Sequence, residues 1–245
     1  MENENITIND ILGQTEQQSK EEYNNFRVAK IREKLYYPIL RGGVSPEQLK
    51  NIADSVKKEQ LNSVISLSGY VPTLLSNLAN STIGVAVAIG YPFGEGEIET
   101  VIRSIKAFAK KPVTEIIAVL SLSDLKFCKA RQTERVLKLL SSISKKKKVS
   151  VMLDCSRFIT EDLEKVIRII SSYNLTSIYV TTGYYGEDFS SDMVLTVKKS
   201  LKKPIKIISG AQDLSMEEAV ALLRDTDGVF TSKSVDLLRD LKQRM

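Results

Sequence analysis

The chain has 245 residues, of which 42% are hydrophobic and 27% charged, so it can bury the core of one large α/β domain. It contains no histidine, which excludes Ser-His-Asp and Cys-His nucleophiles and removes the usual zinc ligand, and its two cysteines, Cys128 and Cys155, form neither a disulfide framework nor a CxxC pair. The net charge of +5 does not indicate a nucleic-acid partner, because the one dense run, "KKKK" at 145–148, lies in a helix-to-strand connection without a nucleic-acid motif.

The N-terminus is acidic and polar. Because it lacks a basic and then apolar leader, and because no apolar run reaches the ~18 residues of a membrane span, we expect a cytoplasmic protein without a membrane partner. Residues 1–24 are poor in large apolar side chains and predict a partly disordered extension, mobile over about its first 18 residues. A helix is expected over about 20–34.

The rest of the chain repeats one unit, an apolar strand followed by an amphipathic helix. The expected strands are 35–40, 62–67, 83–90, 114–121, 149–154, 177–183, 205–210 and 228–232. Ser45 and Pro46 open a helix over 45–59, and Thr160 opens another with a carboxylate in its first turn.

Eight strands that alternate with eight helices in about 210 residues predict a parallel (β/α)8 TIM barrel, an α/β fold, as a single domain over residues 25–245. No GxGxxG follows the first strand, which argues against a dinucleotide-binding sheet. In such barrels the functional site lies at the C-terminal ends of the strands. There the sixth strand ends in "YVTTGYYG", with tyrosine and threonine where a catalytic side chain is often found.

Several stretches resemble the deoxyribose-phosphate aldolase family in the correct order. They are "GGVSPEQLKNIAD" (42–54), "VAIGYPFG" (87–94), "SLSDLK" (121–126), "VSVMLDCSRFITEDLEKV" (149–166), "TTGYYGEDFSSDMVLTV" (181–197), "SGAQDLSMEEAVALL" (209–223) and "GVFTSKS" (228–234). The resemblance covers roughly residues 30–240 and implies a TIM barrel. It also implies a carbon–carbon lyase without cofactor or metal, in which a lysine forms a Schiff base beside a second lysine and an aspartate.

The positions that the resemblance assigns to this chemistry carry other residues. The Schiff-base lysine falls on Tyr179, the second lysine on Ile207 and the strand-four aspartate on Ile117. The strand-two cysteine and asparagine fall on Ile65 and Leu67, and a further aspartate falls on Tyr36. Because a tyrosine cannot form an imine, the resemblance predicts a homologue that has lost the Schiff base and is non-catalytic or repurposed, with a binding or regulatory role.

A remnant of the family's phosphate cradle is expected at Gly183, Gly210, Thr231 and Ser232, where glycines and N–H groups approach an oxyanion. Ala211 replaces the second strand-seven glycine, and Phe230 replaces the strand-eight glycine, so a phosphorylated ligand should bind weakly. A homo-oligomer or a protein partner stays open.

The alternative is an active aldolase on a small sugar phosphate with Lys206 as the imine-forming residue, which a single gap would align. In the ungapped register, Lys206 faces the helices or solvent and Ile207 faces the interior. Lys233 is interpreted as a solvated lysine at a helix start, and Asp154 beside Cys155 as a cap or acceptor. The "YYGED" loop (184–188) is interpreted as an exposed loop.

Overall fold

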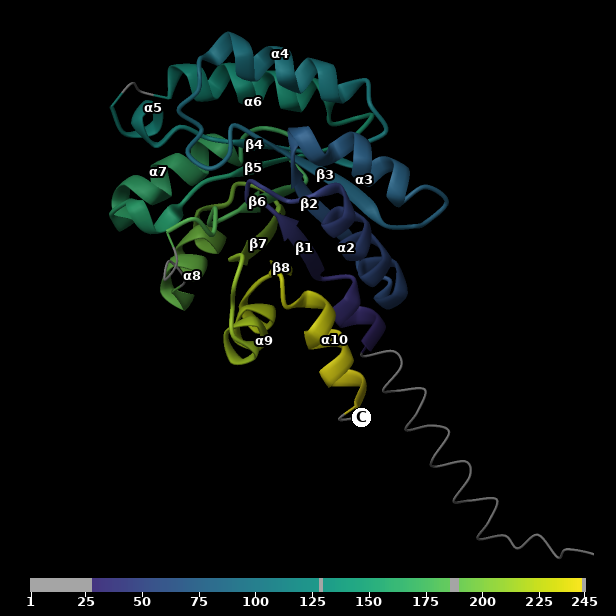
Figure 1. Ribbon diagram of the computed structural model, residues 1–245. Coiled ribbons are helices and arrows are strands. Elements are labelled where there is room, and N and C mark those ends of the chain that lie inside the picture. The colour runs from purple at the N-terminus through teal and green to yellow at the C-terminus, as the bar shows by residue number, and fades with distance from the viewer. Residues whose placement is uncertain (1–27, 128–129, 186–189, 244–245) are drawn as a thin grey trace, which may run out of the picture.

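A computed structural model describes residues 28–127, 130–185 and 190–243 (Figure 1). Eight parallel strands form a closed barrel in chain order, and the first strand pairs with the last. The strands are β1 (Leu35–Ile39), β2 (Ser63–Leu67), β3 (Gly84–Ile89), β4 (Glu115–Val119), β5 (Lys148–Met152), β6 (Ser177–Tyr179), β7 (Lys206–Gly210) and β8 (Gly228–Phe230). The predicted (β/α)8 barrel and all eight predicted strands are confirmed.

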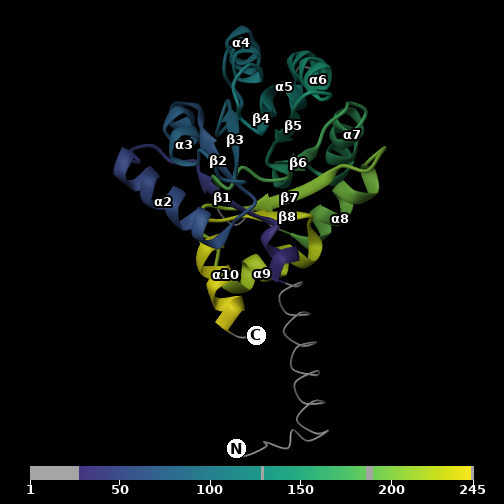
Figure 2. The same cartoon turned by 90° about the vertical axis from the view of Figure 1, so that its right-hand side faces the viewer.

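Helices surround the strands on the outside of the barrel (Figure 2). They are α2 (Pro46–Glu59), α3 (Val71–Asn77), α4 (Ile98–Ala109), α5 (Leu122–Phe127), α6 (Arg131–Ile143), α7 (Thr160–Ile170), α8 (Ser191–Ser200), α9 (Met216–Asp225) and α10 (Ser234–Gln243). Two helices, α5 and α6, follow β4 where one was expected. None of the helices within the described ranges has the length and apolar character needed to cross a membrane.

The start of α2 shows how local sequence sets an element. Ser45 caps the helix by accepting a hydrogen bond from Gln48 N at 3.2 Å, while Gln48 Oε1 accepts one from Ser45 N at 2.8 Å. Pro46 follows at the first helical position, where its missing N–H would have no partner in any case. The predicted start of this helix is confirmed.

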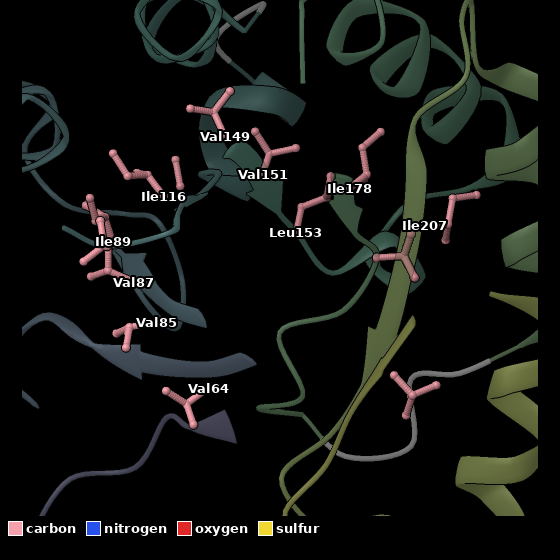
Figure 3. Packing of buried hydrophobic residues seen from close by; sticks show 14 of the residues in the cluster. Val64, Val85, Val87, Ile89, Ile116, Val149, Val151, Leu153, Ile178 and Ile207 are labelled. Carbon is pink, nitrogen blue, oxygen red and sulfur yellow. The ribbon is translucent and has the colours of Figure 1, made fainter. Parts of the chain in front are cut away.

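Side chains alternate along each strand between two apolar clusters. The outer cluster, between strands and helices, includes Val64, Val85, Val87, Ile116, Val149, Val151, Ile178 and Ile207 (Figure 3). The inner cluster fills the barrel and includes Tyr36, Ile65, Ala86, Ala88, Ile117, Met152, Tyr179, Ile208 and Phe230. Because successive side chains of a strand point to opposite faces, each residue belongs to one cluster only. A shift of one residue in the register of a strand would move its side chains to the other cluster.

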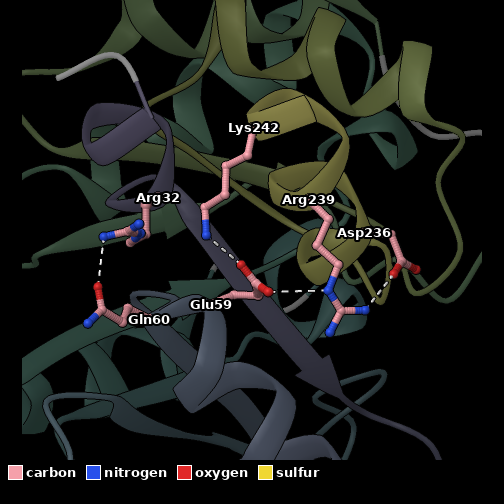
Figure 4. A network of polar contacts seen from close by, with 6 residues as sticks. All are labelled: Arg32, Glu59, Gln60, Asp236, Arg239 and Lys242. Atoms are coloured by element: carbon pink, nitrogen blue, oxygen red, sulfur yellow. Dashed lines mark hydrogen bonds and ion pairs between the residues drawn. The ribbon is translucent and has the colours of Figure 1, made fainter. Parts of the chain in front are cut away.

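Glu59, the last residue of α2, joins this helix to α10 (Figure 4). Its side chain is 6% exposed and accepts hydrogen bonds from Arg239 Nε at 3.2 Å and Lys242 Nζ at 2.7 Å. Burial alone would raise the pKa of Glu59, but these two cations lower it below its ordinary value. The network thus links the last helix to α2 on the outside of the barrel.

Four predictions fall wholly or partly outside the described residues. The extension over 1–24 lies outside them, and of the expected helix over 20–34 the structure describes the part from residue 28, which is helical over 28–32. Cys128 and residues 186–188 of the "YYGED" loop are also outside.

Candidate functional site

Three aromatic rings fill the barrel around Tyr179, the position to which the resemblance assigns the Schiff-base lysine. Tyr179 and Phe230 have no exposed surface, and Tyr36 is buried. The ring centroids of Tyr36 and Tyr179 are 6.3 Å apart, and those of Tyr179 and Phe230 are 6.2 Å apart. Ile65, Ile117 and Ile208 pack in the same inner cluster. The interior at this level is therefore a packed apolar core, as expected from the residues at positions 179 and 117.

A buried carboxyl group, which the sequence reading missed, lies below these rings. Glu115 opens β4 on the interior face, two residues before Ile117, and is 5% exposed. It accepts a hydrogen bond from Ser150 Oγ, and Tyr179 Oη lies 3.5 Å from both of its carboxylate oxygens. Burial raises the pKa of Glu115, and the hydrogen bonds and the charges of Lys148 and Lys206 offset only part of this effect. The sequence signal that could have indicated this group is a single acidic residue, Glu115, in an otherwise apolar strand.

The strand pairing corrects the expected orientation of β7. Ile208 pairs with the inward-facing Tyr179 and lies in the inner cluster, whereas Ile207 pairs with Ile178 and packs against the helices (Figure 3). Lys206 therefore lies on the interior-facing side, contrary to the ungapped count. The expected orientation depended on the length of the α8–β7 connection, which the sequence does not determine. A shift of one residue there moves every side chain of β7 from one face of the strand to the other.

In the corrected orientation, Lys206 lies at the N-terminal end of its strand. Lys206 is the first residue of β7 and is exposed, and Lys148 likewise opens β5. Both act on Glu115 through their charges from the N-terminal ends of the strands. In barrels of this architecture that end contributes to stability, and the reaction site lies at the opposite end.

The buried carboxyl predicts a pH effect on stability. The pKa of Glu115 is raised in the folded chain, so the protonated form is favoured by folding. Its contribution to the free energy of unfolding is complete below pH 4.5, the ordinary pKa, and is lost as the pH rises through the pKa of the folded chain. Glu115→Gln keeps the acceptor for Ser150 and cannot ionise. Urea denaturation should show that the variant loses less stability than the parent between pH 5 and pH 8. Glu134→Gln, at a partly exposed glutamate on α6, is the control and should keep the parent's profile. Identical profiles for Glu115→Gln and the parent would contradict this.

At the mouth of the barrel, the C-terminal ends of the strands, Asp154 is engaged by the β6 loop. Asp154 is 3% exposed and accepts hydrogen bonds from Thr182 N at 2.6 Å, Thr182 Oγ1 at 2.9 Å and Thr181 Oγ1 at 3.4 Å. Gly183 N donates to Thr181 Oγ1 at 2.9 Å. Asp154 is thus a structural acceptor for this turn, in agreement with its interpretation as a cap or acceptor.

The expected phosphate remnant is occupied by contacts within the chain. Thr231 N donates to the carbonyl of Tyr36 at 3.1 Å, and Ser232 N donates to the carbonyl of Gln212 at 2.9 Å. Ser232 Oγ bonds to Asp213 Oδ1 at 3.0 Å, which places a negative charge beside the cradle. A Cβ added at Gly210 would meet Phe230 O at 2.0 Å, so this glycine serves a close strand–strand approach.

Two titratable groups near the mouth, Tyr91 and Cys155, have raised pKa values and hold their protons at neutral pH. Burial, with the charge of Asp154, raises the pKa of Tyr91 to about 12. The same two causes raise the pKa of the Cys155 thiol, which is fully buried. Lys233 is exposed after β8, and its backbone N donates to Thr231 Oγ1 at 3.3 Å.

The sequence of the chain is similar to deoxyribose-phosphate aldolases over the whole barrel. It is 23% identical over 209 residues to the enzyme of Mycoplasmoides pirum, covering 83% of this chain and 94% of that protein. It is 22% identical over 233 residues to that of Caldanaerobacter subterraneus subsp. tengcongensis, covering 92% and 98%. The chain therefore resembles deoxyribose-phosphate aldolases in sequence over most of its length. No protein-family model matches the sequence.

Solved structures agree on the fold of the chain. The tetrameric deoxyribose-phosphate aldolase from Aeropyrum pernix superposes with a TM-score of 0.72 at 17% identity, covering 88% of this chain and 92% of that one. The N-acetylmannosamine-6-phosphate 2-epimerase from Clostridium perfringens, another protein with a similar fold, reaches 0.57 at 12% identity, covering 89% and 94%.

Proposed function

We propose that this deoxyribose-phosphate aldolase family member has lost Schiff-base chemistry and acts as a non-catalytic or repurposed homologue. One observation carries the proposal: Tyr179, Ile208 and Ile117 form the interior at the level of the nucleophile. An imine needs an amine held against a bound carbonyl, and a phenol or an aliphatic side chain cannot supply one. The test is reductive trapping of an imine.

The alternative, an active aldolase with Lys206 as the imine-forming residue, is favoured by the interior-facing side on which this lysine lies. It would require the carbonyl of a substrate to reach the N-terminal ends of the strands, beneath the buried rings of Tyr36 and Tyr179. The same trapping experiment distinguishes the two functions, since only the alternative gives labelling at Lys206. A cytoplasmic location belongs to the proposal on the sequence grounds given above.

A second expectation concerns phosphate at the mouth. Titration calorimetry with 2-deoxyribose 5-phosphate should give a dissociation constant weaker than about 1 mM, which corresponds to less than ~4 kcal/mol of binding free energy. The reasons are that Thr231 N and Ser232 N donate to carbonyls of the chain, and that Asp213 repels an anion. Asp213→Asn, which removes the charge, should tighten any residual binding. A micromolar constant for the unaltered chain would show that the cradle still functions.

A further inference from the structure

An apolar groove runs between α5 and α7 on the outside of the barrel. The cavity has a volume of about 530 Å³. Its apolar lining consists of Leu125, Phe127, Phe158, Ile159, Val166 and Ile169. Phe127 is 79% exposed and Ile159 is 67% exposed, although both are large apolar side chains. Exposed apolar surface that gathers around one groove marks an interaction site.

The rim of the groove is basic. Lys126, Arg157 and Lys165 line it, against one acidic residue, Asp162. Lys165 Nζ lies 3.0 Å from Asp162 Oδ1, while Lys126 Nζ lies 5.2 Å from the centre of the Phe158 ring and Arg157 stacks on Tyr185 at 4.2 Å. The net rim charge is therefore positive, which favours an acidic occupant with apolar side chains.

The chain itself contains a segment of this chemistry. Residues 1–12, "MENENITINDIL", carry Glu2, Glu4 and Asp10, and no lysine or arginine occurs before Lys20. The same twelve residues hold four large aliphatic side chains, Ile6, Ile8, Ile11 and Leu12. This segment precedes the described part of the chain, which begins at Val28.

The distance around the barrel determines whether residues 1–12 of the same chain or of a second copy can reach the groove. The described chain begins next to β1, whereas the groove lies beside β5, on the opposite side of the closed barrel (Figure 1). The residues between Leu12 and Val28 span at most ~55 Å when fully extended. A domain of this size has a radius of roughly 22 Å, so half of its girth is about 70 Å. We propose that the groove between α5 and α7 receives the acidic N-terminal segment, residues 1–12, of a second copy of this chain.

Cross-linking of mixed isotopes tests the proposal on the full chain. Unlabelled and 15N-labelled protein are mixed, equilibrated and treated with a carbodiimide, which joins carboxylates to amines in contact. Mass spectrometry should find Glu2, Glu4 or Asp10 joined to Lys126 or Lys165, with mixed-isotope pairs as frequent as same-isotope pairs. Sedimentation should show a species larger than the monomer at the same concentration.

Two substitutions and a matched control complete the test. Ile8→Asp, which lies outside the barrel, and Lys165→Glu should each lower the yield of cross-links to Lys126 at least about fivefold and shift sedimentation towards the monomer. Lys138→Glu is the control, because Lys138 is equally exposed and forms a similar ion pair with Glu134 on α6. Same-isotope pairs alone, equal labelling of Lys138, or yields unchanged by both substitutions would overturn the proposal.

Discussion

Borohydride reduction in the presence of 2-deoxyribose 5-phosphate or acetaldehyde is expected to leave no stoichiometric label at any single lysine of this protein. The nucleophile level of the barrel is filled by the rings of Tyr36, Tyr179 and Phe230. The interior-facing lysines that open β5 and β7 lie at the opposite end from the mouth. An amine at that end is not held against a carbonyl bound at the mouth. Imine formation at a specific lysine depends on such positioning, which raises the effective concentration of the amine at the carbonyl.

The measurement is intact-mass and peptide mass spectrometry after reduction, with an active deoxyribose-phosphate aldolase as the positive control. Sparse label spread over exposed lysines agrees with the proposed loss of chemistry. One label per chain at Lys206, removed by Lys206→Met, would establish the aldolase alternative instead. Lys233→Met serves as the matched variant at the mouth end, because it removes an exposed lysine from the C-terminal side of the barrel.

Replacing Gly210 by alanine is expected to cost roughly 3 kcal/mol or more of unfolding free energy. Gly210 has φ +153°, and an added Cβ would lie 2.0 Å from Phe230 O and 2.8 Å from Phe230 N, which are backbone atoms that cannot rotate away. Strands β7 and β8 would have to separate at a buried pair, Gly210 and Phe230. Urea denaturation should show a lower midpoint with a similar slope.

Gly69→Ala is the control for this substitution. Gly69 lies in the short helical turn after β2, has no atom within 4 Å of an added Cβ and does not adopt a positive φ. Its replacement should change stability by less than about 1 kcal/mol. If Gly210→Ala unfolded at the same urea concentration as Gly69→Ala, the close approach of β7 and β8 would not be the reason for glycine at 210.

The barrel was predictable from the sequence because hydrophobic periodicity recurs eight times and each strand is bounded by helix starts such as Ser45–Pro46. The side-chain orientation of β7 could not be predicted from the sequence. Both Ile207 and Ile208 are apolar, so neither composition nor pattern distinguishes an interior position from a helix-facing one, and the faces depend on a loop length. The pairing of Tyr179 with Ile208 determines them.

The residues at the positions that the resemblance assigns to imine chemistry could be read from the sequence, whereas their contacts could not. Tyr179 and Ile117 could be read one residue at a time, because a phenol supplies no amine and an aliphatic side chain no carboxylate, whatever surrounds them. That Ser232 bonds to Asp213, or that Tyr179 lies over Glu115, depends on residues 19 and 64 positions apart in the chain. Such contacts follow from the closure of the barrel and have no local signature.

The contact between Tyr179 and Glu115 also bears on the evolutionary history of the chain. A single reversion of Tyr179 to lysine would place an ammonium beside a buried carboxyl group, and the resulting ion pair would hold the amine in its protonated, unreactive form. Productive reversion would need Glu115 and the surrounding rings to change as well. Under the proposed loss of Schiff-base chemistry, Glu115 and Tyr179 together would act as an epistatic barrier, because replacing Tyr179 alone would not give a reactive amine.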